Sequence, residues 1–189
     1  GAVHDLAARI LDALGAGIPC IFTGDFNFYN NSEAGYATLI AAGNGRLRGI
    51  RYGTGWDGTD SNAKFGARNT PRHELLDATL RKGFARLQAL GLSYDAWMFY
   101  PQLPELADFL RSFPNLNVIL NHAGGLLRMP PQNDGHNEEF EIWCRYMREL
   151  AQFPNLNIKV GGLGMPHCGW DFHLRDVPPS SEELAAAWR

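Results

Sequence analysis

The chain has 189 residues, of which 45% are hydrophobic and 20% are charged, as in ordinary globular proteins. Its 17 basic and 20 acidic residues leave a formal net charge of −3 with no long block of one sign, which argues against a nucleic-acid-binding face or a membrane-surface helix. No apolar run approaches the roughly 20 residues that span a bilayer. We therefore expect a small-molecule partner rather than a nucleic acid or a membrane, and the sequence leaves the oligomeric state open.

The first segment, GAVHDLAARILDAL, has the amphipathic pattern of a helix and carries acidic residues, so it does not resemble a signal peptide. The three cysteines, Cys20, Cys144 and Cys168, are widely spaced and form no C-x-x-C motif. An odd count at such spacing is typical of reduced thiols, which predicts a cytoplasmic location.

Both ends of the sequence favour a fragment of a longer protein. The chain starts with Gly1 rather than Met, and it stops at Arg189 inside the predicted helix of PPSSEELAAAWR. That helix has a capping-box pattern at Ser180 and Glu183 and no stop signal. We interpret residues 1–189 as a single, incomplete domain.

Helical and strand patterns alternate along the chain, which indicates βαβ units and a parallel sheet. The predicted strands are residues 18–26, 47–52, 93–100, 116–122 and 156–162. Three helices are predicted from their apolar faces. One runs over about 72–90 and ends at Gly91, and its apolar face is formed by Leu76, Leu80, Phe84, Leu87 and Leu90. The faces of the other two are formed by Leu103, Leu106, Leu110 and Phe113, and by Phe140, Trp143, Met147 and Leu150.

One sequence motif occurs twice: residues 113–118 read FPNLNV and residues 153–158 read FPNLNI. Each copy follows a helical pattern and leads into an apolar segment rich in β-branched residues. A propeller blade would need four strands per repeat, whereas each unit here holds one strand and one helix. The repeat therefore supports an α/β architecture.

The loops differ in length on the two sides of the predicted sheet. Links from helix to strand are short, whereas three links from strand to helix are long and polar: GTGWDGTDSNAKFGARNTP, AGGLLRMPPQNDGHN and residues 162–179. Parallel α/β proteins place their sites at the carboxyl ends of the strands, in the loops that follow. Five strands are compatible with a doubly wound sheet or with part of a (β/α)₈ barrel, which usually takes about 250 residues when complete.

Five polar residues lie at or just beyond the predicted strand ends: Asp25, Arg51, Tyr100, Gln102 and His122. His122 suits a metal ligand, a general base or a carbonyl-polarising group, and equally a histidine that only holds a loop. Arg51 has the fork that binds a carboxylate, or it forms a structural ion pair. Tyr100 and Gln102 are candidates to hydrogen-bond a polar substrate or to pack. Asp25 is a candidate substrate contact or a turn cap.

Two other patterns carry little weight. GGLGMPHCG has a G-x-G after a predicted strand but lacks the third glycine of a dinucleotide-binding loop. His167, Cys168 and His173 lie close together, yet their spacing matches no standard structural zinc site.

The segments LRGIRYGTGWD, LGLSYDAWMFYPQLPELADF, FPNLNVILNHAGG, PNLNIKVGGLGMPHCGWDFH and PPSSEELAAAW occur in this order over roughly residues 45–189. Together they resemble the amidohydrolase-related (amidohydrolase 2) family of predicted metal-dependent TIM-barrel hydrolases, which is similar to 2-pyrone-4,6-dicarboxylate lactonase. The resemblance implies a partial (β/α)₈ barrel in which the five predicted strands are the third to the seventh.

The resemblance also implies roles for individual residues. Arg51 matches the arginine of the family's G-[IV]-R strand, which is associated with a substrate carboxylate, and Tyr100 falls near a tyrosine position. His122 matches the histidine of the [DN]-H-x-G strand end, and Gly125 replaces the usual proline. The His-x-His of the first strand and the aspartate of the last strand are absent from this sequence.

These matches predict a hydrolase that acts on a lactone of a small carboxylated or sugar-like compound. A divalent metal such as zinc is expected only in the full-length protein, because His122 alone cannot supply the three protein ligands of a catalytic zinc. The fragment alone is therefore expected to be inactive. A metal-dependent decarboxylase on the same barrel and a non-catalytic module that binds a small anion remain the alternatives.

Overall fold

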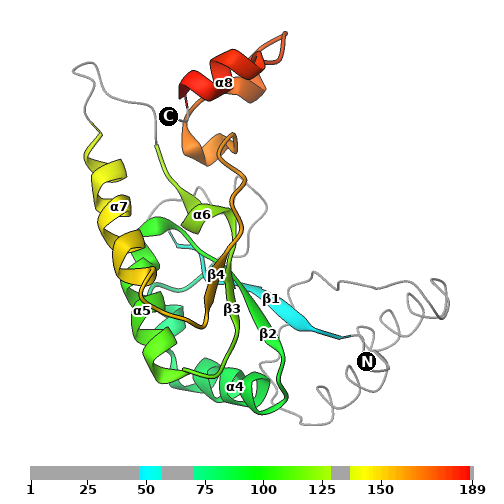
Figure 1. Ribbon diagram of the computed structural model, residues 1–189, viewed down its shortest axis with the longest axis vertical. Helices are drawn as coiled ribbons and strands as arrows, with labels where there is room; N and C mark the ends of the chain where they lie inside the picture. The colour runs from blue at the N-terminus through cyan, green and yellow to red at the C-terminus, as the bar shows by residue number, and fades with distance from the viewer. Residues whose placement is uncertain (1–46, 57–69, 129–136, 188–189) are drawn as a thin grey trace, which may run out of the picture.

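A computed structural model describes residues 47–56, 70–128 and 137–187, so the predicted strand over residues 18–26 and the candidate residue Asp25 lie outside the described part. Four strands form one parallel sheet in which neighbours follow chain order (Figure 1). They are β1 (Gly49–Gly53), β2 (Ser93–Trp97), β3 (Val118–Leu120) and β4 (Leu156–Ile158). The predicted parallel α/β sheet is confirmed. Over the described residues β1 and β4 are its edges, and the sheet does not close into a barrel.

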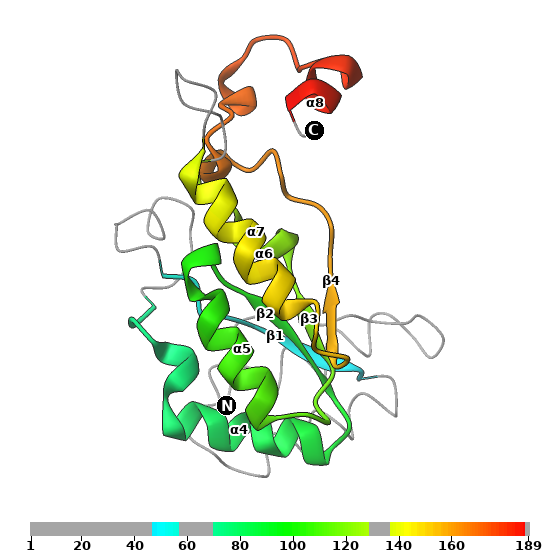
Figure 2. The same cartoon turned by 60° about the vertical axis from the view of Figure 1, so that its left-hand side comes forward.

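The longer helices cover one side of this sheet. They are α4 (Ala78–Ala89), α5 (Leu103–Ser112) and α7 (Glu138–Leu150). In both ribbon views they lie together on one side of the strands, whereas α8 (Ser181–Ala187) stands apart at the end of the molecule opposite α4 (Figures 1 and 2). Short helical turns occupy the connections: η1 (Glu74–Leu76), η2 (Tyr100–Gln102), α6 (His122–Gly125), η3 (Pro166–Cys168) and η4 (Phe172–Leu174).

Local capping explains where the helices begin and end. The carboxylate of Asp77 accepts a hydrogen bond from the backbone N–H of Leu80 at 2.8 Å and caps the start of α4, so the predicted helix start at about residue 72 is too early. The same helix has Leu90 as its C-cap, and Gly91 follows with a φ of 66°, as predicted.

The capping box predicted at the start of α8 is confirmed. The Ser180 hydroxyl accepts from the backbone N–H of Glu183 at 3.2 Å, and the Glu183 carboxylate accepts from the backbone N–H of Ser180 at 2.9 Å. No helix of the described residues is both long and apolar enough to cross a membrane.

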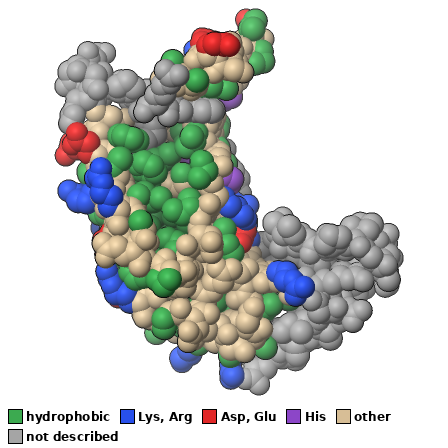
Figure 3. Space-filling model, in the orientation of Figure 1, with side chains coloured by type: hydrophobic (Ala, Val, Ile, Leu, Met, Phe, Trp, Pro, Cys, Tyr) green, Lys and Arg blue, Asp and Glu red, His purple; other side chains and the backbone are tan. Residues whose placement is uncertain are grey.

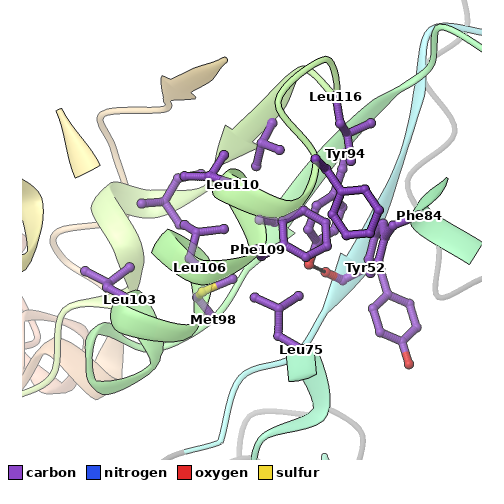
Figure 4. Packing of buried hydrophobic residues seen from close by; sticks show 14 of the residues in the cluster. Tyr52, Leu75, Phe84, Tyr94, Met98, Leu103, Leu106, Phe109, Leu110 and Leu116 are labelled. Carbon is purple, nitrogen blue, oxygen red and sulfur yellow. Dashed lines mark hydrogen bonds between the residues drawn. The ribbon is translucent and has the colours of Figure 1, made fainter. Parts of the chain in front are cut away.

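The hydrophobic core lies between the sheet and its helices. Residues of β1 and β2 alternate in burial, and Ile50, Tyr52, Tyr94 and Ala96 face the helices. The ring of Phe84 from α4 lies 4.4 Å from that of Tyr94 and 4.8 Å from that of Phe109, centroid to centroid (Figure 4). This packed side of the sheet supplies most of the burial that stabilises the fold.

Three residues of the predicted apolar faces are exposed, which corrects the sequence prediction. Leu76 is 44% exposed because it belongs to η1, before α4 begins. Leu90 is 45% exposed at the end of α4. Phe140, also 45% exposed, lies in the first turn of α7 and stacks on Trp143.

The repeated motif has a structural counterpart. Both copies connect a helix to a strand, α5 to β3 and α7 to β4, and the two strands are paired so that Val118 lies beside Leu156. The Asn157 side chain donates to the Asn117 carboxamide oxygen at 2.8 Å, and the Asn155 side chain donates to the backbone carbonyl of Phe113 at 3.0 Å. The two copies therefore stack on one another.

All four predicted strands of the described part are present, but three end earlier than predicted. β2 ends at Trp97, β3 at Leu120 and β4 at Ile158. Consequently Tyr100 lies in η2 rather than at a strand end, and His122 lies in the turn after β3.

On the face shown in Figure 3, Lys and Arg side chains are spread around the edges and do not gather in one patch.

Candidate functional site

The face of the sheet turned away from the helices carries a row of charged side chains. In β1 and β2 the residues that alternate with the buried ones are half-buried, and they include Arg51, Asp95 and Trp97. Arg51 lies beside Asp95 in the register of the two strands. Strand alternation therefore places these side chains on the face opposite the core.

An ion pair crosses β3 on this face. The Lys159 ammonium, one residue beyond β4, pairs with the Asp95 carboxylate. The Asp95 side chain is only 19% exposed, whereas that of Lys159 is 55% exposed. The Arg51 guanidinium makes no hydrogen bond or ion pair with any residue in the described part of the chain. The row thus holds two cations and one carboxylate, with one guanidinium left available to a ligand.

His122 enters the site through a turn of unusual backbone conformation. Four consecutive residues have positive φ: His122 (52°), Ala123 (51°), Gly124 (81°) and Gly125 (62°). Left-handed backbone costs roughly 1–2 kcal/mol for a residue with a side chain. Non-glycine residues in such conformations cluster at functional sites. The conformation of His122 is therefore consistent with a functional role, although exposed His73 has a similar φ of 59°.

The two glycines of this turn are required by its geometry. A Cβ on Gly125 would lie 2.0 Å from the backbone carbonyl oxygen of Met98. Proline cannot adopt a φ of 62°, because its ring fixes φ near −65°. The glycine that replaces the family's usual proline is thus the residue that this turn needs.

The imidazole of His122 lies against the loop that follows β4. A Cβ built on Gly162, whose φ is 75°, would lie 2.7 Å from His122 Nδ1. Burial and the charges of Arg51 and Lys159 lower the pKa of His122 below its ordinary value of 6.5. The imidazole is therefore neutral at pH 7 and has a free lone pair, as a general base or a hydrogen-bond acceptor requires.

Tyr100 and Gln102 are placed away from this row. The Tyr100 hydroxyl is buried next to Glu139 of α7, and burial together with that carboxylate raises its pKa to about 12. Gln102 is 3% exposed; its Nε2 donates to the Thr54 carbonyl at 2.6 Å, and its Oε1 accepts from the backbone N–H of Trp56 at 2.8 Å. This carboxamide joins the end of β1 to η2. The geometry favours a structural role for both residues over the predicted contact with a substrate.

Three further residues of this face were not among the sequence candidates. Asp95 and Lys159 form the ion pair, and Asn121, 1% exposed, has a side-chain nitrogen that meets no acceptor among the described residues. In the sequence, the alternation of polar and apolar residues in SYDAW could have pointed to Asp95, and the lysine of LNIKVGG could have pointed to Lys159. Only strand pairing shows that these two segments, separated by β3, face one another.

The loop after β4 does not form a zinc site. The Cys168 thiol is buried and lies 3.4 Å from the backbone carbonyls of Leu126 and Gly162, and burial raises its pKa to about 11. The ring of His167 packs edge-on against Phe99. Across residues 47–56, 70–128 and 137–187, no three His, Cys, Asp or Glu side chains come together as a metal-binding group.

Comparison with known proteins identifies the family. The amidohydrolase family model Amidohydro_2 matches residues 27–188. The chain belongs to this amidohydrolase family. The sequence resemblance noted over residues 45–189 is thereby confirmed, and the match begins earlier than that resemblance did.

Two curated relatives give the match more detail. An uncharacterized protein, y4mH, of Sinorhizobium fredii is 40% identical over 108 residues, which are 57% of this chain and 33% of the relative. An L-fucono-1,5-lactonase of Burkholderia ambifaria is 33% identical over 87 residues, which are 46% of this chain and 28% of the relative. The matched segments therefore span about a third of the length of these relatives.

A solved structure is similar in fold. It is an amidohydrolase of Burkholderia multivorans with bound HEPES, at 24% identity and a TM-score of 0.65. The likeness covers 97% of this chain and 57% of that protein. It confirms the predicted fold class: parallel strands with flanking helices that correspond to part of an amidohydrolase (β/α)₈ barrel.

Proposed function

We propose that this chain supplies part of the active site of a hydrolase that opens a lactone of a small carboxylated or sugar-like compound. The observation that carries the proposal is a half-buried His122, whose pKa is lowered by burial and by the nearby charge of Arg51, together with an Arg51 guanidinium that has no hydrogen-bond or ion-pair partner in the described part of the chain. Support comes from the family and from two relatives named L-fucono-1,5-lactonase, of which the second, from Burkholderia multivorans, is 31% identical over 99 residues.

The chemistry assigns one role to each group. In lactone hydrolysis, water adds to the ring carbonyl, the ring C–O bond breaks, and a hydroxy acid results. The free lone pair of His122 accepts a hydrogen bond or a proton from the attacking water. The Arg51 guanidinium holds an anionic group of the substrate through paired N–H donors. A half-buried site strengthens both interactions relative to water.

A divalent metal such as zinc remains a prediction for the full-length protein. His122 is the one described candidate ligand, and a catalytic zinc needs about three protein ligands. Because the described residues bring no such set together, the roles above are derived without a metal.

The test is a substitution that removes the imidazole but suits the backbone. Asparagine tolerates left-handed φ better than alanine does, so His122→Asn separates the loss of the ring from strain in the turn. In the product of the full reading frame that contains this chain, assayed on L-fucono-1,5-lactone and related lactones, this variant should lower kcat/KM at least about tenfold. Proton release from the hydroxy acid product measures the rate.

His73→Asn is the matched control, because His73 also has positive φ, at 59°, and is exposed among the helices. It should leave kcat/KM within about twofold of the parent protein, since the His73 imidazole pairs with Glu105 of α5, on the helical side of the sheet. Wild-type turnover in His122→Asn would contradict a catalytic role. Release of carbon dioxide instead of a hydroxy acid would identify a decarboxylase, and ligand binding without turnover would identify an anion-binding module.

A further inference from the structure

Lys159 is held over the same face by three interactions that involve neighbouring strands. Its backbone N–H donates to the Leu120 carbonyl at 2.9 Å, and its carbonyl accepts from the backbone N–H of Ala123 at 3.0 Å. Leu120 and Ala123, which these two bonds join to Lys159, flank His122 in the sequence. The ammonium then reaches across β3 to the Asp95 carboxylate.

The direction of this side chain is informative. A lysine at the exposed edge of a sheet usually extends its ammonium into water, where hydration is strongest. Here the chain folds back over the sheet face, and the Asp95 carboxylate that holds it is largely shielded from solvent. An ion pair whose ammonium is still half-exposed stabilises a fold only weakly, so folding alone explains little of this arrangement.

The charges of the row do not cancel. Asp95 lies beside Arg51 in the register, and it pairs with Lys159 on its other side. One carboxylate therefore stands between two cations, which leaves a net charge of about +1 next to His122. An anion that takes the place of the Asp95 carboxylate at the Lys159 ammonium and also contacts Arg51 would meet a donor from each cation.

We propose that Lys159 is a second ligand-contacting cation of this site, that Asp95 positions its ammonium, and that together with Arg51 it selects small hydroxylated carboxylates over their neutral analogues. The inference rests on the proposed function for the location of the site and adds the ligand class. Lys159 binds the anion directly, and the Asp95 carboxylate keeps the ammonium over the sheet while the site is empty.

The probes are D-gluconate and D-glucitol, which differ in carrying a carboxylate or a neutral hydroxymethyl group. Binding to the product of the full reading frame is measured by calorimetric titration. The parent protein should bind gluconate more tightly than glucitol. Lys159→Met should weaken gluconate binding at least about tenfold, since it removes a charged hydrogen-bond donor, and should leave glucitol binding unchanged.

A double variant separates contact from net charge. Asp95→Asn combined with Lys159→Met restores the net charge of the row without restoring the ammonium. If Lys159 touches the ligand, the double variant binds gluconate as weakly as Lys159→Met does. Recovery of parental affinity in the double variant would overturn the contact and leave only a general charge effect.

Lys82→Met, at an exposed position of α4, is the control for loss of any lysine and should change neither affinity. Parental gluconate affinity in Lys159→Met, or equal affinity of the parent for both probes, would overturn the proposal. Circular dichroism of each variant reports whether it is folded. Lactone turnover is measured separately. If the protein turns over lactones but Lys159→Met leaves gluconate affinity unchanged, this inference alone is refuted. If Lys159→Met weakens gluconate binding but no lactone is turned over, the proposed hydrolase alone is refuted.

Discussion

The two faces of the same sheet have opposite characters. Toward the helices, Tyr94, Val118 and Leu120 are fully buried in an aromatic and aliphatic core. On the other face the neighbouring positions carry Arg51 and Asp95, and the face is completed by residues just beyond the strand ends. Because successive residues of a strand point to opposite sides, a five-residue strand serves both purposes. One face supplies stability and the other presents charge to a ligand.

The largest loss of stability should follow a change on the helical face. Phe109→Ala removes a fully buried ring that lies 4.7–5.6 Å, centroid to centroid, from three other aromatic rings. The free energy of unfolding, measured in urea, should fall by about 3–5 kcal/mol. Phe140→Ala, at a ring that is 45% exposed, should cost far less. Equal losses would contradict the assignment of the core.

Stability should be nearly as sensitive to a change in the turn that follows β3, residues His122–Gly125. Gly125→Ala combines a positive φ with a contact of 2.0 Å to the Met98 carbonyl oxygen, so we expect a loss of about 2–5 kcal/mol. Gly91→Ala has a similar φ, 66°, and nothing within 4 Å of the new Cβ, and should cost only about 1–2 kcal/mol. Thermal or urea unfolding of the two variants measures the difference, which should vanish if close packing in the turn is unimportant.

The structural role of Gln102 predicts a smaller effect. Gln102→Leu would leave the Thr54 carbonyl and the Trp56 N–H without their partner, at a cost of about 1–3 kcal/mol in the free energy of unfolding. Gln88→Leu removes a more exposed carboxamide that accepts one hydrogen bond, from the Asn115 N–H, and should be milder. A substrate-binding role would instead appear as a rise in KM at unchanged stability.

The smallest change in stability should come from the charged face. Arg51→Met removes a guanidinium that has no hydrogen-bond or ion-pair partner in the described part of the chain, so the free energy of unfolding should shift by no more than about 0.5 kcal/mol. Gluconate binding to the same variant should nevertheless fall. A large loss of stability would show that Arg51 is structural, the alternative that the sequence left open.

Periodicity and composition were sufficient to predict the parallel α/β class, the short links before the strands and the capping box of α8. These features depend on residues that are near one another in the chain, so local patterns report them. Strand lengths were overestimated because apolar residues continue past the last ladder pair, as in MFY after β2. The resemblance singled out Arg51 and His122; the structure places His122 in the turn after β3, whereas Arg51 lies in the middle of β1 on the face opposite the core.

The sequence by itself determined which segments are strands, that their carboxyl ends carry the long loops, and that glycines follow His122. Tertiary structure alone decided which polar residues share a face. In the folded protein the Gln102 side chain links the end of β1 to η2 by hydrogen bonds, and the Asp95 carboxylate pairs with Lys159 across β3. The physical reason is that strand register and left-handed turns are set by contacts between distant segments, which no local pattern records.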